Sequence, residues 1–188
     1  MTKLSIQKPV SPLHWLSLYR LYLSAFPASE RKPFSIIYRM YRQGRTDVWR
    51  ICRGNRMVGM ATTVNGDGLV LLDYFAVDGG LRGQGIGSEA LKMLQQMYAN
   101  VGFFGEIEST REDVPERELR LRRMAFYRRG GMEPLDVHAV VFGVKMELLG
   151  SRCSLNFEDY RNFYEKYYSP WAAKHILEDE NHGKRTDA

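Results

Sequence analysis

Residues that build metal centres and disulfide frameworks are scarce in this sequence. Its 188 residues include only two cysteines, Cys52 and Cys153, and four histidines that are scattered along the chain. Neither set has the close spacing of metal ligands, so we expect no metal site. A single distant cysteine pair also argues against a disulfide-stapled secreted fold.

Long apolar runs are absent as well. No stretch is long enough to cross a bilayer, and the first fifteen residues, MTKLSIQKPVSPLHW, lack an apolar core of signal-peptide length. We therefore expect a cytoplasmic protein that does not contact a membrane.

Positive charge is present in modest excess, with a formal net charge of +5. This excess favours anionic partners such as a nucleotide, a phosphorylated cofactor or nucleic acid, and it is also compatible with an ordinary solvated surface. Arginines gather between Arg117 and Arg129, where Glu116 and Glu118 interrupt the run of charge. No aromatic stacking platform or groove-reading motif accompanies them, so we expect no nucleic-acid partner.

The remaining composition suits one sizeable core, because 44% of the residues are hydrophobic. Ser11 and Pro12 form a typical helix start, and Gly54-Asn55 is typical of a two-residue hairpin. Hydrophobic periodicity predicts helices over 11–26, 33–44, 88–99, 116–131 and 156–171 and strands over 3–8, 47–53, 56–64, 69–77, 103–109, 135–143 and 144–149. The strand–loop–helix–strand run 69–109 predicts a right-handed parallel unit.

The segment VDGGLRGQGIGSEAL, residues 77–91, carries five glycines between a predicted strand and a predicted helix. Glycines at a helix N-terminus let a phosphate approach unpaired backbone N–H groups. A P-loop is excluded because Gly87-Ser88-Glu89 lacks the required lysine. A dinucleotide loop beginning at Gly83 would have Ser88 in place of its third glycine and Glu106 as its ribose acid. It would also lie too far from its strand, whereas a flexible turn without a ligand remains an open alternative.

The stretch Arg82-Gly83-Gln84-Gly85-Ile86-Gly87 matches the Q/R-x-x-G-x-G/A pyrophosphate loop of the GNAT superfamily of acetyl-CoA-dependent N-acetyltransferases. YFAVDGGLRGQGIGSEAL resembles the central strand, loop and helix of that family, RRMAFYRRGGM resembles a later family segment, and AFPASERKPF resembles a stretch of a bacterial subgroup. The order of predicted elements over 1–149 is similar too.

The resemblance implies an α/β GNAT fold, with a mixed central sheet of about seven strands and flanking helices. We expect an acetyltransferase domain over 1–150, followed by a C-terminal helical extension and polar tail over 151–188. The aromatic stripe in that extension covers either the core or another subunit, so a homodimer is an open alternative.

The resemblance also implies that acetyl-CoA is the acyl donor. The main chain of the strand end would bond the pantetheine amides, and the loop with Ser88 would hold the pyrophosphate. The predicted cofactor-binding residues are therefore Phe75, Ala76, Val77, Arg82, Gly83, Gln84, Gly85, Ile86, Gly87 and Ser88.

The predicted catalytic residues are Tyr127 and Glu106. Tyr127 matches the family tyrosine near the thiolate leaving group, and a phenol can donate a proton to that thiolate. The alternative role for Tyr127 is packing on an amphipathic helix. Glu106 and Glu108 point to one face of their strand, and burial would make either carboxylate a better base. A solvated face, an ion pair with nearby arginines, or deprotonation of the amine through water remain alternatives.

Acceptor binding is expected to involve Glu30, Asp73 and Glu108. Glu30 lies between the first two helices, where the family shapes its acceptor site, and would either bind a cationic amine or pair with Arg31. Asp73 interrupts an apolar strand. The acceptor is a small-molecule or protein amine, and polyamines, amino-acid derivatives, aminoglycosides and protein N-termini all stay open.

The predicted function is transfer of acetyl from acetyl-CoA to a primary amine by direct attack in a ternary complex. No cysteine lies in a recognisable nucleophile setting, so a covalent acetyl-enzyme is not expected. A non-catalytic acyl-CoA-binding sensor or regulatory module is the alternative function.

Overall fold

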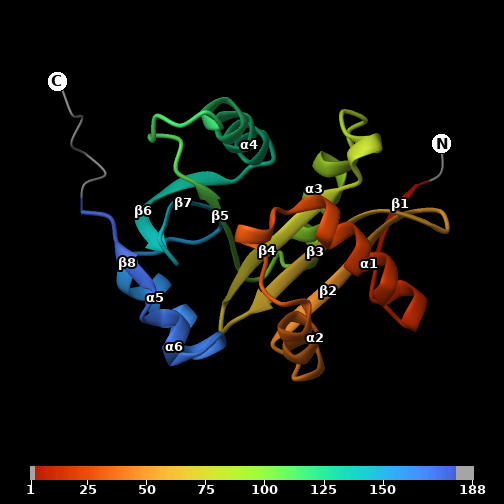
Figure 1. The fold of residues 1–188 in the computed structure, drawn as a ribbon, viewed down its shortest axis with the longest axis horizontal. Coiled ribbons are helices and arrows are strands. Elements are labelled where there is room, and N and C mark those ends of the chain that lie inside the picture. The colour runs from red at the N-terminus through yellow and green to blue at the C-terminus, as the bar shows by residue number, and fades with distance from the viewer. Residues whose placement is uncertain (1–2, 181–188) are drawn as a thin grey trace. The chain divides into compact units, whose positions relative to one another are not determined.

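The computed structural model describes residues 3–180, which form six α-helices, two short 3-10 helices and eight strands (Figure 1). The chain divides into two compact units, Met1–Asn100 and Val101–Ala188, which are described in turn.

The first unit contains four strands and three α-helices. Its strands pair antiparallel in the order β1-β2-β3-β4. Its elements in chain order are β1 (Leu4–Gln7), α1 (Pro12–Ala25), η1 (Ala28–Glu30), α2 (Phe34–Arg42), β2 (Thr46–Arg53), β3 (Arg56–Asn65), β4 (Leu69–Val77), η2 (Gly79–Leu81) and α3 (Ile86–Met97).

Local sequence signals account for these boundaries. The Ser11 side chain accepts a hydrogen bond from the backbone of His14 at the start of α1, and Pro12 fills the first helical position. Arg53 lies opposite Arg56 across the Gly54-Asn55 turn, so the predicted two-residue hairpin is confirmed.

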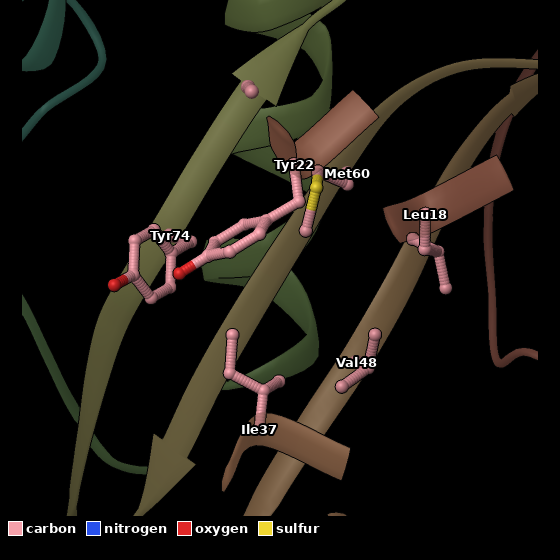
Figure 2. Close-up of a cluster of buried hydrophobic side chains, with 7 residues drawn as sticks. Leu18, Tyr22, Ile37, Val48, Met60 and Tyr74 are labelled. Carbon is pink, nitrogen blue, oxygen red and sulfur yellow. The ribbon is translucent and has the colours of Figure 1, made fainter. Parts of the chain in front are cut away.

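The first sheet is covered on both faces. Leu18 and Tyr22 of α1 and Ile37 of α2 pack onto Val48 and Met60 of the strands, as Figure 2 shows. On the opposite face, Ile86 and Ala90 of α3 form a second cluster with strand residues. The strand residues of this cluster are Leu4, Ile51 and Val58. Successive strand residues point to opposite faces, so β2, β3 and β4 contribute to both clusters, whereas β1 contributes Leu4 to the second.

The second unit pairs its strands antiparallel in the order β5-β7-β6-β8. Phe163 of α5 (Phe157–Tyr167) packs edge-on against Phe104 of β5 (Gly102–Glu108), with ring centroids 5.2 Å apart. The elements in chain order are β5 (Gly102–Glu108), α4 (Arg117–Arg129), β6 (Glu133–Val141), β7 (Val144–Ser151), α5 (Phe157–Tyr167), α6 (Pro170–Ala173) and β8 (Ile176–Glu178).

The predicted fold class is confirmed, with eight strands rather than about seven. Strand β8 was missed because three residues show no alternation, and it exists only through its pairing with β6. Of the predicted polar tail, residues 181–188 lie outside the described residues. The helical part of the predicted extension, α5, belongs to the second compact unit.

Candidate functional site

The glycine segment forms the connection between β4 and α3. Asp78 caps the short helix η2, because its side chain accepts a hydrogen bond from the backbone of Gly80 at 3.0 Å. Gly83 and Gly85 follow with φ angles of 78° and 76°. This left-handed region is strained for residues with a Cβ, so the chain takes this course because glycines occupy both positions.

Helix α3 begins directly after Gly85, which caps it without a side chain. The first backbone N–H groups of α3 therefore have no side-chain cap, and they carry the partial positive charge of the helix N-terminus. A Cβ built on Gly83 or Gly85 would meet no atom within 4 Å, so the loop surface is open. Arg82, Gln84 and Ser88 are exposed beside it. This arrangement can bind a phosphate group.

The predicted loop residues differ in what they can offer a ligand. Ile86 is buried in the cluster beneath α3, so only its backbone can contact a ligand, and Gly87 likewise has only its backbone to offer. Arg82 has an extended backbone, with φ −64° and ψ 156°, and its guanidinium can donate paired hydrogen bonds to a phosphate.

Phe75, Ala76 and Val77 end β4 and pair with β3 at Ala61, Met60 and Gly59, respectively. The Ala76 side chain lies in the cluster under α1, and the side chains of Phe75 and Val77 pack on the α3 side. A Cβ built on Gly59 would lie 2.7 Å from the Ala76 carbonyl oxygen. The close approach of β3 to β4 at this point therefore requires a glycine at position 59. The Ala76 side chain is buried, and those of Phe75 and Val77 are partly buried against the core.

Asp73 sits at an irregularity of the β3–β4 ladder. Thr62 pairs with Tyr74 and Thr63 pairs with Leu72, so Asp73 is the extra residue of a bulge. Its carboxylate accepts a hydrogen bond from the Lys32 ammonium at 2.6 Å. Asp73, the one charged residue of this apolar strand, therefore forms a mostly buried ion pair with Lys32 in the loop before α2.

Tyrosine hydroxyls hold that loop in place. The Tyr74 hydroxyl donates to the Glu30 carbonyl at 2.9 Å and accepts from the Lys32 amide at 3.0 Å. The Tyr22 hydroxyl donates to the Lys32 carbonyl at 3.0 Å. Burial raises the pKa of Tyr22 to about 12 and raises that of Tyr74 as well, so both stay protonated at neutral pH.

A pocket of about 280 Å³ opens beside this loop. Its lining consists of Tyr19, Tyr22, Leu23, Ala28, Arg31, Lys32, Pro33 and Phe34. Glu30 does not line this pocket, and its side chain is exposed. Arg31 donates to the Leu23 carbonyl at 3.4 Å, so the structure places the Arg31 guanidinium on α1.

Tyr127 lies near the C-terminal end of α4, with its ring 5.1 Å from that of Phe126. Burial raises the pKa of Tyr127 to about 12, and the nearby Arg123 guanidinium acts in the opposite direction. The phenol is therefore protonated at neutral pH and can act as a proton donor.

Glu106 lies on β5, where two tyrosines of α5 reach it. The hydroxyls of Tyr160 and Tyr164 each donate to its Oε1 at 2.8 Å. The sequence pattern predicts the aromatic stripe of α5 but not these bonds. The available signal was the spacing of four between two tyrosines, because a buried phenol needs a hydrogen-bond partner.

Two further acids of the second unit form an ion pair or hydrogen bonds. Glu108, two residues beyond Glu106, forms an ion pair with Arg123 of α4. Glu147 of β7 is buried and was missed in the sequence. Its Oε1 accepts three hydrogen bonds from the segment after β5: from Ser109 Oγ at 3.1 Å, from the Thr110 amide at 2.6 Å and from Thr110 Oγ1 at 2.9 Å.

Within residues 3–180, no group of three or more acidic, histidine or cysteine side chains is arranged to hold a metal ion. None of the helices in this part of the chain combines the length and apolar character of a membrane span.

Solved structures share this fold. A protein from Bacteroides thetaiotaomicron, described as a GNAT-family acetyltransferase, superposes with a TM-score of 0.73 at 21% identity, covering 87% of this chain and 98% of that one. A GNAT acetyltransferase from Elizabethkingia anophelis with acetyl-CoA bound gives a TM-score of 0.59 at 16% identity, covering 80% and 98%. The ribosomal-protein-S18-alanine N-acetyltransferase from Escherichia coli gives 0.57 at 15% identity, covering 81% and 96%.

No curated protein matches the chain. A model of the acetyltransferase (GNAT) family matches residues 15–130, which is more than half of the sequence. The match spans α1 to the end of α4 and contains the glycine loop, Glu106 and Tyr127. The chain therefore belongs to the acetyltransferase (GNAT) family and is an acyltransferase, as the glycine loop predicted.

Proposed function

We propose that this protein transfers acetyl from acetyl-CoA to a primary amine by direct attack in a ternary complex. The observation that carries the proposal is the open glycine loop, with positive φ at Gly83 and Gly85, at the uncapped N-terminus of α3. Family membership supports the pyrophosphate of CoA as the anionic ligand of this loop.

Acetyl-CoA binds at the end of β4 and at the loop before α3. The main chain of Phe75, Ala76 and Val77 bonds the pantetheine amides, and the backbone of residues 82–88 binds the pyrophosphate. The Arg82 guanidinium donates two hydrogen bonds to a phosphate, and the partial positive charge at the N-terminus of α3 attracts the same anion. The Elizabethkingia structure with acetyl-CoA bound shows that a protein of this fold accepts this donor.

Glu106 and Tyr127 carry the proton transfers. The amine nitrogen attacks the thioester carbonyl carbon, and the carbon–sulfur bond then breaks. Glu106 accepts the proton that the amine loses, and Tyr127 donates a proton to the departing thiolate. Tyr127 keeps its proton at neutral pH, as an acid must, although burial, which raises its pKa to about 12, makes it a weaker proton donor than a free phenol.

Glu30 is the first candidate for binding the acceptor. Its side chain is exposed, whereas Asp73 and Glu108 already pair with Lys32 and Arg123. A cationic amine could bind Asp73 or Glu108 only by displacing those partners. The acceptor itself is a small-molecule or protein amine. The related Escherichia coli enzyme acts on an alanine of ribosomal protein S18.

Two measurements test the proposal. Saturating acetyl-CoA should raise the thermal unfolding midpoint, and thiol release from acetyl-CoA should require an amine from a panel of polyamines, amino acids, aminoglycosides and peptides. Stabilisation without thiol release from any amine would favour the alternative, a non-catalytic acyl-CoA sensor. Failure of acetyl-CoA to stabilise the protein would contradict both functions.

A further inference from the structure

Helix α5 lies outside the residues matched by the family model, yet it contacts the proposed base. Both Tyr160 and Tyr164 donate to the same oxygen, Oε1 of Glu106, at 2.8 Å. Two phenols on one carboxylate oxygen are more than packing of α5 requires, since its aromatic rings already pack against Phe104.

The geometry of α5 makes this contact well defined. Tyr160 and Tyr164 lie one turn apart and therefore face the same side. The helix start is held by a capping box, in which the Asn156 side chain accepts from the Asp159 amide at 2.8 Å and the Asp159 side chain accepts from the Asn156 amide at 3.3 Å. Tyr160 is fully buried and Tyr164 nearly so, which restricts both rings.

The direction of proton donation is also defined. Burial, together with the negative charge of Glu106, raises the pKa of Tyr160 well above its usual value of 10. The phenol therefore keeps its proton over the working pH range and acts as donor. Hydrogen bonds donated to a carboxylate favour its ionised form, which is the form a base must have.

We propose that Tyr160 and Tyr164 are positioning residues for acetyl transfer, which hold the Glu106 carboxylate in one orientation and in its ionised form. The inference rests on the proposed function, in which Glu106 accepts the amine proton. It gives α5 a role in catalysis, although neither tyrosine contacts the reacting atoms.

The pH dependence distinguishes positioning from simple packing. If one phenol is removed, the ionised carboxylate loses a donor and its proton affinity rises. Glu106 then becomes protonated at a higher pH, so activity disappears earlier as the pH falls. A purely structural loss would instead lower the rate by the same factor at every pH.

The experiment measures kcat/KM against pH for Tyr164→Phe and Tyr160→Phe, with the amine that supports thiol release. We expect the acidic limb of each profile to move up by about one pH unit, the size expected for one hydrogen bond to a charged group. Phenylalanine keeps the packing of the ring and removes only the hydroxyl. If the variant at the fully buried Tyr160 does not fold, Tyr164→Phe alone tests the proposal.

Tyr98→Phe is the matched control, because it removes a phenol that donates to another carboxylate, Asp47 Oδ2 at 3.2 Å, in the first unit. Its acidic limb should stay where the wild type has it. Tyr164→Phe should cause no further loss in a Glu106→Gln background. Unshifted acidic limbs in both tyrosine variants would overturn the positioning role and leave acetyl transfer standing. A wild-type protein that releases no thiol would overturn acetyl transfer itself, and the positioning role with it.

Discussion

Single residues of the candidate site are defined mainly by their partners. Asp73 stood out in the sequence as a charge in an apolar strand, and the structure gives the reason. A bulge places it next to Lys32, 41 positions away, at 2.6 Å. A mostly buried carboxylate is tolerated when it is paired, so this acid also fastens the loop before α2.

Lys32→Met should therefore destabilise the protein by about 1–3 kcal/mol, since Asp73 would keep its charge without its cation. Urea unfolding measures the change. The double variant Lys32→Met, Asp73→Asn should recover part of the loss, because no charge is then left unpaired. Equal stability of the single variant and the wild type would show that this ion pair contributes nothing.

Tyr127→Phe should lower kcat by about a hundredfold, the usual contribution of a general acid, and leave the Kd of acetyl-CoA unchanged. Steady-state kinetics and calorimetric titration measure the two quantities. Tyr38→Phe is the control, because it removes a phenol that is 41% exposed on α2. An unchanged kcat for Tyr127→Phe would assign this tyrosine to packing.

At the scale of elements, the connection between β4 and α3 follows directly from its sequence. Gly83 and Gly85 have positive φ, and Asp78 caps η2, so interactions between near neighbours in the chain set the course of this loop. Helix α5 is different. Its amphipathic pattern and its Asn156 cap predict a helix, but the pattern does not indicate which strand its tyrosines reach.

Gly83→Ala and Gly85→Ala should each cost about 1–2 kcal/mol of stability, because alanine is strained in the left-handed region. Each should also weaken acetyl-CoA binding, as measured by titration calorimetry. Gly44→Ala controls for the strain, since Gly44 has φ 71° in open space after α2. We expect Gly44→Ala to lose comparable stability and to bind acetyl-CoA normally. Normal binding by both loop variants would argue against a phosphate site there.

At the scale of the whole molecule, tyrosines with raised pKa values make the stability of the fold depend on pH. Burial raises the pKa of Tyr22, Tyr98 and Tyr127 to about 12 in each case. These tyrosines keep their protons in the folded state when the unfolded chain, with a pKa near 10, has already lost them. The folded state then binds more protons, so stability must fall as the pH rises.

The free energy of unfolding should therefore be insensitive to these tyrosines below pH 10 and should decrease between about pH 10 and 12. Urea unfolding across this range measures the slope. Tyr98→Phe should make the slope shallower, because one titrating group is removed. An unchanged slope would show that Tyr98 does not contribute to it.

The sequence by itself determined the order of the strands and α-helices from β1 to α5, the Gly54-Asn55 hairpin, the glycine loop and, through that loop, the family. These features depend on turn chemistry, capping and periodicity, which act over a few neighbouring residues. The boundary at 150 and a homodimer remain predictions, because no observation on this chain bears on them.

Only the tertiary structure decided which partners the predicted acids have. Asp73 meets Lys32, Glu106 meets Tyr160 and Tyr164, and the bonding partners are separated by 41, 54 and 58 positions in the chain. Strand β8 likewise exists only because β6 offers it an edge. Such contacts form between residues that are far apart in the chain and that the fold brings together. Local sequence pattern does not indicate which distant residues become neighbours.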